Sequence, residues 1–165
     1  MSKGLIVGII IFSIIVIGGS YFLVSGDQKS ASAIASYSVS DKARPKAEVK
    51  TTYYVLGKMK VSDEKSTEFT IKNSGQKPLQ LSGISSSCNC TFAQVIIEGK
   101  ESDLFGMHNV SEFAGEILPG KSGKIKVIYR PYIMPVYGPI EREVYVTTND
   151  PENEKLVFKV KAIVN

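Results

Sequence analysis

The sequence contains no tryptophan, one histidine and two cysteines among its 165 residues. The single histidine, His108, excludes a catalytic centre built from several histidines, and two cysteines cannot supply the disulfide framework of a small secreted domain. A Ser-His-Asp order, a phosphate-cradling Gly-rich loop and an acidic metal cage are also missing. Because an enzyme needs two or three groups in defined roles, we expect that this chain is not an enzyme.

The charge pattern shows no stripe of basic residues. The formal net charge is +4, and lysine and arginine are interspersed with aspartate and glutamate. Proteins that bind nucleic acid show a basic stripe, commonly with aromatic residues between the basic ones. We therefore expect no nucleic-acid partner.

An uncharged apolar run occupies residues 5–24. A helix of about 20 residues, at roughly 1.5 Å rise per residue, spans a hydrocarbon core of about 30 Å. The run predicts a transmembrane anchor at 5–24 behind a cytoplasmic tail at 1–4, and the positive charge of Lys3 favours a cytoplasmic N-terminus. The chain is thus predicted to be a single-pass protein of the cell membrane whose C-terminal domain is extracytoplasmic.

A cleaved signal peptide is the alternative interpretation of this run. The apolar region of a signal peptide is usually about 7–15 residues long, which is shorter than the run here. The small-x-small sequence Ala31-Ser-Ala33 lies well beyond the run, and there is no lipobox cysteine, so a retained anchor is favoured. Residues 25–52 are rich in Ser, Ala and Lys with few large apolar side chains, and they predict a flexible stalk.

Residues 53–165 alternate between apolar and polar side chains in short segments. In one of these segments Thr67, Phe69 and Ile71 share a face, and the last segment places Leu156, Phe158, Val160, Ala162 and Val164 on one face. The pattern predicts an all-β fold, an immunoglobulin-like antiparallel β-sandwich of about seven strands. The missing tryptophan and the absence of a widely spaced cysteine pair exclude a true antibody-type domain.

Turn residues separate these segments. Gly75 is expected to supply a positive φ, and Pro78 presets its own φ. At Gly83 the alternation changes parity, which predicts a β-bulge. The residues assigned to turns are Asn73, Gly75, Pro78, Gly83, Pro119, Gly120, Asn149, Asp150 and Pro151.

Cys88 and Cys90 are the candidate functional residues, because an extended strand would place both sulfur atoms on one face. The first interpretation is a pair of buried core thiols facing inward beside Ile84 and Phe92. The second is a disulfide. Cα atoms two residues apart on a fully extended strand are roughly 6.6 Å apart, close to the upper limit of about 6.8 Å for a bridge. The chain would therefore have to bend to form the bond.

The third interpretation of the cysteine pair is a soft-metal site. Thiolates and thioethers suit Cu(I), and imidazole also binds copper. If the loops at one end of the sandwich converge, Cys88 and Cys90 would meet Met107, His108 and Met134. The alternative for Met107 and His108 is an ordinary loop tip whose methionine packs beneath it. A structural zinc site is poorly matched, because the paired Cys/His spacings are missing.

The order of several short motifs resembles a known family. These motifs are Phe69-x-Ile71-x-Asn73-x-Gly75, Pro78-Leu79, Ser87-Cys88-x-Cys90-Thr91, Leu118-Pro119-Gly120, Gly123-x-Ile125-x-Val127, Gly138 and Thr147-Thr148-Asn149-Asp150-Pro151. Together they resemble the bacterial domain of unknown function 1573, which is similar to the immunoglobulin-like folds of major sperm protein and PapD. The resemblance covers residues 53–165. It implies a location in the cell envelope and a binding or scaffolding role, without a characterised activity.

Two features depart from that family. Asn89 stands where the family commonly has Gly, and the interval from Thr91 to Pro119 is longer, so the chain resembles a longer-loop variant.

The function predicted from the sequence is a membrane-anchored binding or scaffolding module. We expect the N-terminal helix to contact the membrane and the sandwich to bind a protein partner. A partner strand can add to an unpaired sheet edge through main-chain hydrogen bonds. The alternative is a Cu(I)-binding or thiol-redox protein that uses the Cys-x-Cys segment with Met and His from neighbouring loops. A thioredoxin-type oxidoreductase is disfavoured, because the spacing is not Cys-x-x-Cys and no helix follows to lower a thiol pKa.

Overall fold

The computed structural model describes Gly4, Phe12, Ser13 and residues 33–165. The chain divides into two units, Met1–Ser32 and Ala33–Asn165. In the first unit Gly4, Phe12 and Ser13 are helical, and the rest of the predicted tail and anchor, with residues 25–32 of the predicted stalk, lies outside the described residues. Among the residues that are described, no helix has the length and apolarity needed to cross a membrane.

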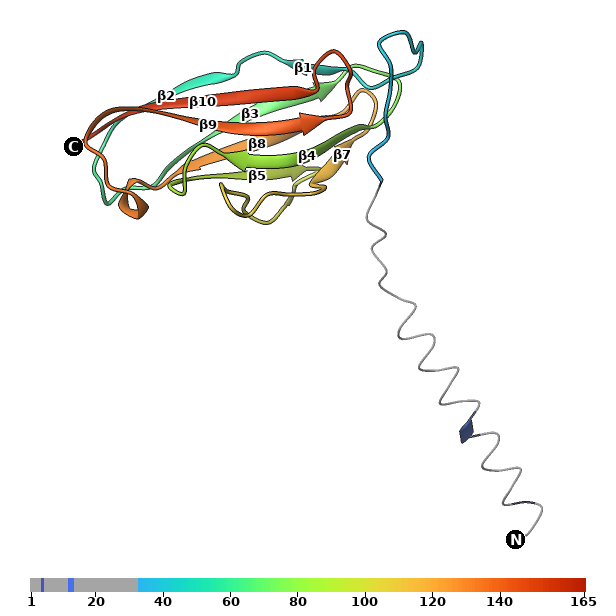
Figure 1. Ribbon diagram of the computed structural model, residues 1–165, viewed down its shortest axis with the longest axis horizontal. Helices are drawn as coiled ribbons and strands as arrows, with labels where there is room; N and C mark the ends of the chain where they lie inside the picture. The colour runs from blue at the N-terminus through green and yellow to red at the C-terminus, as the bar shows by residue number, and fades with distance from the viewer. Residues whose placement is uncertain (1–3, 5–11, 14–32) are drawn as a thin grey trace. The chain divides into compact units, whose positions relative to one another are not determined.

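The second unit is a sandwich of two five-stranded sheets (Figure 1). One sheet has the order β1-β3-β8-β5-β6, with bounds Ala47–Val49, Lys65–Asn73, Ser122–Tyr129, Thr91–Ile97 and Lys100–Glu101. The other has the order β2-β10-β9-β4-β7, with bounds Tyr53–Met59, Lys155–Val164, Gly138–Thr148, Leu79–Ser86 and Gly115–Ile117. Neighbouring strands are antiparallel except β2 and β10, which are parallel. The predicted all-β, immunoglobulin-like sandwich is confirmed, and β1, β6 and β7 are short strands beyond the seven expected.

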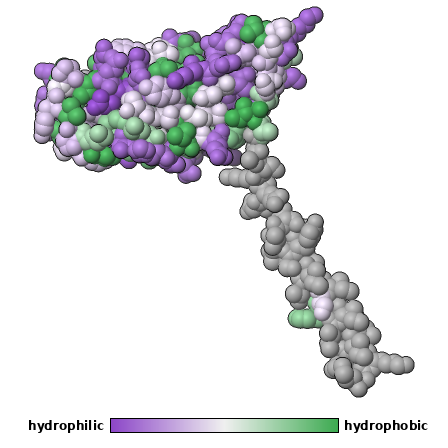
Figure 2. All heavy atoms as spheres, viewed as in Figure 1, coloured by the Kyte–Doolittle hydropathy of each residue, from purple (hydrophilic) through white to green (hydrophobic). Residues whose placement is uncertain are grey.

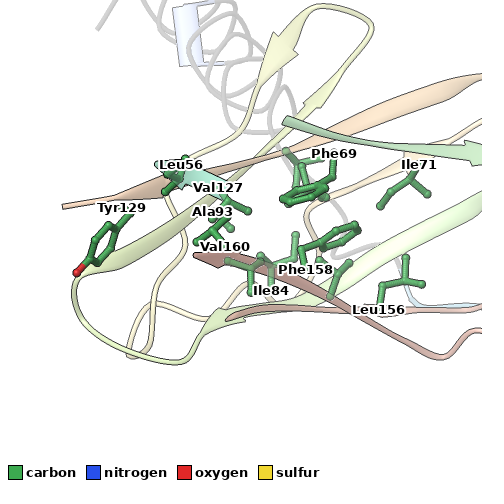
Figure 3. Packing of buried hydrophobic residues seen from close by; sticks show 14 of the residues in the cluster. Leu56, Phe69, Ile71, Ile84, Ala93, Val127, Tyr129, Leu156, Phe158 and Val160 are labelled. Carbon is green, nitrogen blue, oxygen red and sulfur yellow. The ribbon is translucent and has the colours of Figure 1, made fainter. Parts of the chain in front are cut away.

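The core lies between the two sheets and follows the period-two pattern of the strands (Figure 3). On β10 the residues Leu156, Phe158, Val160, Ala162 and Val164 are buried, while Lys159 and Lys161 lie on the outer face. The rings of Phe69 and Phe158 pack across the sandwich with their centroids 5.0 Å apart. Each large apolar side chain buried in this way contributes roughly 1.5–3 kcal/mol of transfer free energy.

Strand β4 changes the face that it buries at Gly83. Leu79 and Leu81 are buried before this glycine, and Ile84 and Ser86 are buried after it. The pairing of β4 with β9 shifts register between Ser82 and Ser85, and Gly83 has a φ of 54°. A β-bulge at this position reverses the parity of the strand.

The domain begins before Tyr53, so the predicted stalk boundary is wrong. Strand β1 pairs with β3 from Ala47↔Asn73 to Val49↔Ile71, which places part of the predicted stalk inside a sheet. Further upstream, the backbone N–H of Ala35 donates a hydrogen bond to Gln80 Oε1 at 2.7 Å. The predicted boundary was too late for a physical reason. Backbone hydrogen bonds and polar side chains hold this segment, and the scarcity of large apolar residues in it does not reveal them.

Gly75 also has a different role from the one predicted. Its φ is not among the positive values of the described glycines. Instead, a Cβ atom at this position would lie 2.6 Å from the carbonyl carbon of Pro45, because the segment entering β1 passes directly over the glycine. Close approach of two backbones, and not a left-handed conformation, therefore requires glycine here.

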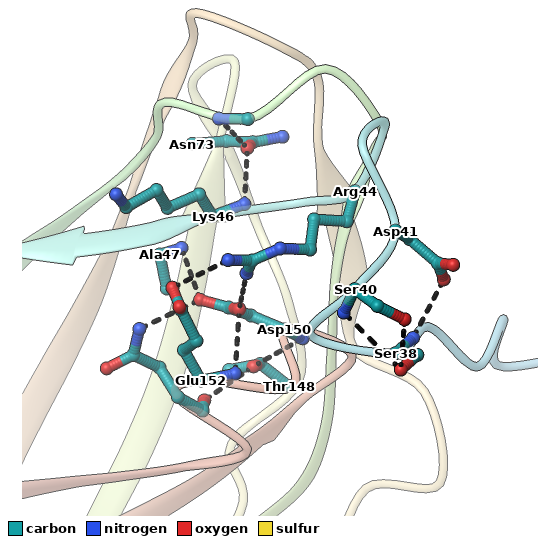
Figure 4. A network of polar contacts seen from close by, with 12 residues as sticks. Ser38, Ser40, Asp41, Arg44, Lys46, Ala47, Asn73, Thr148, Asp150 and Glu152 are labelled. Carbon is teal, nitrogen blue, oxygen red and sulfur yellow. Dashed lines mark hydrogen bonds and ion pairs between the residues drawn. The ribbon is translucent and has the colours of Figure 1, made fainter.

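A buried polar cluster around Asp150 attaches this entering segment to the rest of the domain (Figure 4). The Asp150 carboxylate is fully buried and accepts hydrogen bonds from Ala47 N–H at 2.9 Å, Asn153 Nδ2 at 2.9 Å and Glu152 N–H at 3.1 Å. It also pairs with Arg44 Nη1 at 3.2 Å, and Arg44 Nη2 pairs with Glu152 at 2.9 Å. We call these five residues the Asp150 cluster.

Two asparagines next to the Asp150 cluster satisfy buried backbone groups. Asn73 Oδ1 accepts hydrogen bonds from Gly75 N–H and Lys46 N–H, and Asn73 Nδ2 donates to the carbonyls of Lys77 and Ile117. Asn149 makes similar contacts at the start of β4. Its Oδ1 accepts a hydrogen bond from Gln80 N–H, and its Nδ2 donates to the carbonyl of Pro78 and to Gln80 Oε1. Pro119 and Gly120 form the turn between β7 and β8, in which Gly120 has a φ of 76° and Lys121 N–H donates to Leu118 C=O.

Replacing the buried carboxylate by Asp150→Ala is expected to lower the free energy of unfolding by about 3 kcal/mol, because it leaves the buried Ala47 N–H without an acceptor and removes one of the two carboxylates that pair with Arg44. Urea unfolding measures the change. Glu68→Ala removes an acidic residue from the exposed ion pair with Lys124, and it should cost less than about 1 kcal/mol. Equal losses for the two variants would contradict a structural role of the Asp150 cluster.

Candidate functional site

The two cysteines lie in the turn that connects β4 to β5, and a disulfide joins them with their Cα atoms 5.3 Å apart. Thr91 N–H donates a hydrogen bond to Cys88 C=O at 3.3 Å, which closes the turn. The expectation of an extended strand here is wrong, and the bend brings the Cα atoms well within bridging distance. Of the three interpretations of the pair, the structure contains the disulfide, and no free cysteine is present in the described residues.

The strand after the turn buries the opposite face from the one predicted. Thr91, Ala93 and Val95 point into the core, while Phe92 is half-buried on the outer face. The guanidinium carbon of Arg130 lies 5.0 Å from the centroid of the Phe92 ring. The turn at the cysteines changes the parity of the chain, so the alternation cannot be extended through it.

Hydrogen bonds to Glu143 on β9 and to Arg130, the residue after β8, hold the turn in place. Ser87 N–H donates to Glu143 C=O on β9, and Glu143 N–H donates to Ser87 Oγ, both at 2.9 Å. Arg130 N–H donates to Cys90 C=O at 2.8 Å, and Ser86 Oγ donates to Cys88 C=O at 2.8 Å. The disulfide therefore lies on a turn whose position does not depend on the sulfur–sulfur bond alone.

The two sulfur atoms have different surroundings. Cys90 is fully buried, and Arg142 Nε donates a hydrogen bond to its Sγ at 3.3 Å. Cys88 is half-buried, and its Sγ lies 3.3 Å from Thr91 Oγ1. A guanidinium next to sulfur stabilises a thiolate relative to a thiol. If the disulfide is broken, this contact would therefore favour negative charge on the sulfur of Cys90.

Arg142 occupies an inward-facing position of β9. It is in phase with the buried residues Ile140, Val144 and Val146, and its guanidinium carbon lies 5.9 Å from the centroid of the Tyr129 ring. Arg142 Nη1 donates to the backbone carbonyl of Glu141 at 2.9 Å. Arg142 was not among the residues predicted from the sequence, although an arginine in phase with core residues is a signal that the sequence carries.

Tyr129 supports Arg142 from inside the sandwich. It pairs with Thr91 across the sheet and is fully buried, and its hydroxyl has no hydrogen-bond partner within the part of the chain that the structure describes. Figure 3 shows this hydroxyl pointing away from the other labelled core residues. Burial raises the pKa of Tyr129, and the positive charge of Arg142 opposes that rise, so the phenol remains neutral at physiological pH.

The outer face of β9 and β10 carries a ladder of paired charges. Lys159 contacts Glu143 at 2.7 Å and Glu141 at 3.5 Å, and Lys161 contacts Glu141 at 3.0 Å. The hydrogen bond from Lys159 lowers the pKa of Glu143, and the hydrogen bond to Glu143 raises the pKa of Tyr145. All of these groups are satisfied by one another, so the ladder offers no group poised for chemistry.

The structure does not assemble the ligands proposed for Cu(I). The disulfide leaves neither Cys88 nor Cys90 as a thiolate, while Met107, His108 and Met134 lie on exposed loops. Across residues 33–165 and the three other described positions, no group of three or more His, Cys, Asp or Glu side chains is placed to hold a metal ion.

Solved structures with a similar fold come from unrelated sources. One is a protein of unknown function from Porphyromonas gingivalis W83, at TM-score 0.55 and 21% identity over 72% of this chain and 46% of that chain. Another is a family 123 glycoside hydrolase from Clostridium perfringens, at TM-score 0.51 and 12% identity over 68% of this chain and 22% of that chain. This chain thus spans less than half the length of either protein, and the likeness shows the fold alone. The ASH/PapD-like domain 7 of human CEP192 matches at TM-score 0.45 and 14% identity, over 79% of this chain and 98% of that domain.

No curated protein shows significant similarity to this sequence. Residues 45–162 match the family model described as HYDIN/CFA65/VesB-like, Ig-like domain, which includes β1 and nearly all of the sandwich. The chain therefore belongs to the HYDIN/CFA65/VesB-like family of immunoglobulin-like domains.

Proposed function

We propose that this chain is a membrane-anchored, extracytoplasmic binding module and not an enzyme, and that it binds a protein through a loop at one end of the sandwich. The immunoglobulin-like domain supports a binding or scaffolding role. The uncharged run at residues 5–24 supports the anchor, and the motifs that resemble the domain of unknown function 1573 support a location in the cell envelope.

The observation that carries the proposal is an exposed apolar loop between β8 and β9. We call residues 131–137 the tip loop. It contains no charged residue and includes the short 3-10 helix η2 (Pro131–Ile133). Its exposed fractions are high for large apolar side chains: Tyr132 48%, Ile133 41%, Met134 45%, Val136 41% and Tyr137 70%. Elsewhere on the face shown in Figure 2, apolar residues are scattered among hydrophilic ones.

The composition of the tip loop suits a protein partner. Contiguous exposed apolar residues mark interaction sites, and tyrosine is enriched among the residues that dominate binding energy. Pro131 and Pro135 restrict the backbone, which reduces the entropy lost when the loop is immobilised. The partner is therefore expected to present an apolar groove that accepts tyrosine side chains.

The tip loop and the first described residues of the domain lie at opposite ends of β9. The loop precedes the first residue of β9, whereas the contact between Ala35 and Gln80 lies beyond the other end of β9, next to Asn149. Eleven residues of extended strand separate the two ends by about 35 Å. Within the domain, the tip loop is thus remote from residues 33–37, with which the described sandwich unit begins (Figure 1).

The sheet edges are less suited to a partner strand. On its β1 side, β3 has a strand partner only at Ile71–Asn73, but Lys65, Glu68 and Lys72 place charges along this strand. The ammonium group of Lys65 donates hydrogen bonds to the backbone carbonyls of Leu56 and Lys58 on the edge strand β2, at 2.9 and 2.8 Å. Charged side chains, and lysine in particular, protect edges from strand addition.

Photo-crosslinking tests whether the tip loop binds a protein. The photoreactive amino acid p-benzoylphenylalanine replaces Tyr132 in the full chain, which is expressed in cells of the organism that encodes it. We expect one discrete adduct with another protein. Adding Tyr137→Ser should weaken binding about 30-fold, because the loss of one dominant side chain costs about 2 kcal/mol of binding free energy. The yield of the adduct should fall accordingly. The same crosslinker at Tyr54 is the matched control, because Tyr54 is 49% exposed and lies on β2.

Four outcomes would contradict the tip-loop proposal. They are an absence of any adduct at Tyr132, an adduct with lipid alone, an adduct with a second copy of this chain, and a stronger adduct at Tyr54, which would favour addition of a strand at the β2 edge.

Deletion of residues 2–32 tests the membrane anchor separately. We expect the full chain to sediment with membranes and to resist extraction by carbonate, because an uncharged run of about 20 residues spans the bilayer. The deleted chain should remain in the supernatant with its domain folded. A full chain found in the supernatant, or an N-terminus missing from the mature protein by mass spectrometry, would refute a retained anchor.

A further inference from the structure

We propose that the Cys88–Cys90 turn is a thiol–disulfide exchange site that accepts electrons from a protein dithiol, and that Arg142 makes Cys90 the leaving group. The inference rests on the contacts of the two sulfur atoms. It does not require the tip loop to bind a partner.

The unequal burial of the cysteines selects the sulfur that is attacked. Cys88 is half-buried, whereas Cys90 is fully buried beneath the turn. An attacking thiolate must reach one of the two sulfur atoms directly. The more accessible sulfur is therefore attacked, and the other sulfur is the leaving group. An incoming thiolate therefore reaches Cys88, and the electron pair of the broken bond goes to Cys90.

Arg142 is placed to stabilise that electron pair. Its Nε–H donates to Cys90 Sγ at 3.3 Å, and its guanidinium is held from two further sides by the Glu141 carbonyl and the Tyr129 ring. Exchange is faster when the leaving thiol has a lower pKa. An adjacent arginine lowers a thiol pKa, which offsets the opposing effect of burial.

The exchange balances in two steps. A thiolate of the donor attacks Cys88 Sγ, which forms a mixed disulfide and releases Cys90 as a thiolate beside Arg142. The second thiolate of the donor then attacks the donor sulfur of the mixed disulfide and releases Cys88. The donor loses two electrons and becomes a disulfide, and Cys88 and Cys90 gain the two electrons and take up protons from solvent.

The fold should survive this change of state. The bond closes a ring of only three residues, and the stabilisation from a disulfide falls with the size of the loop that it closes. The contacts between Ser87 and Glu143 and between Arg130 and Cys90 are made by backbone and hydroxyl groups and use no sulfur atom, so we expect them to persist in the reduced form. We expect reduction to shift the urea midpoint by roughly 1 M or less. A collapse of the folded state on reduction would show that the bond is structural and would overturn the proposal.

The decisive experiment uses the full chain in detergent, oxidised in air, with glutathione as a monothiol probe and reduced thioredoxin as a dithiol probe. We expect glutathione to be found on Cys88 by peptide mass mapping, and thioredoxin to reduce the bond. Arg142→Gln should slow reduction about three- to tenfold at pH 7, the effect of raising the leaving-group pKa by one or two units. Arg142→Lys should retain most of the rate, which also guards against misfolding of the glutamine variant.

Arg130→Gln is the matched control. It removes the same charge from the same end of the domain, but the Arg130 side chain contacts Glu64 and the Phe92 ring and no sulfur atom. A second readout follows the ultraviolet absorbance of the Cys90 thiolate in Cys88→Ser, whose pKa should rise when Arg142→Gln is added. The proposal fails if no disulfide forms in air, if glutathione is found on Cys90 as readily as on Cys88, or if Arg130→Gln and Arg142→Gln change the rate equally.

Discussion

Backbone pairing holds β9 between β10 and β4, with Val144 opposite Phe158 on one side and opposite Ser86 on the other. A slip of one residue in either pairing would reverse the face on which every side chain of β9 lies. Arg142 then could not reach the sulfur of Cys90, and the Glu143 backbone would lose its register with Ser87. The strand leads directly into the Asp150 cluster at one end and follows the tip loop at the other. One central strand thus sets the positions of the cysteine turn, the entry of the chain and the exposed loop.

The strands were predictable because each long strand buries one face, and burial imposes a period of two that the sequence shows directly. Phe69 and Phe158 are in phase with buried neighbours in the sequence and pack against each other in the structure. The extent of the domain was less predictable, since Ala47 joins it through a backbone hydrogen bond to a carboxylate 103 positions later in the chain. Gly75 illustrates the same limit. Glycine is required at this position because the backbone of Pro45, distant in sequence, passes close to it, and local turn rules do not consider such distant segments.

The geometry at the two cysteines differs from the one expected from the sequence. The spacing of the two cysteines drew attention to them, yet the alternation of Ile84 and Phe92 suggested a strand that continues through the pair. The turn interrupts that alternation, and it is this bend that permits the disulfide. Arg142 is 52 positions away from Cys90 in sequence, so only the pairing of β9 brings them together. A charged residue in phase with core positions is the pattern by which similar sites could be recognised.

The tip loop and the cysteine turn are neighbours at one end of the sandwich. The Arg130 N–H that holds the Cys90 carbonyl belongs to the residue immediately before the tip loop. A protein seated on Tyr132 would therefore lie at the same end of the sandwich as the cysteine turn. If that protein carries a dithiol, binding would supply the high local concentration that speeds exchange, because a tethered reaction becomes effectively intramolecular. The redox state of the turn would then depend on whether the tip loop is occupied.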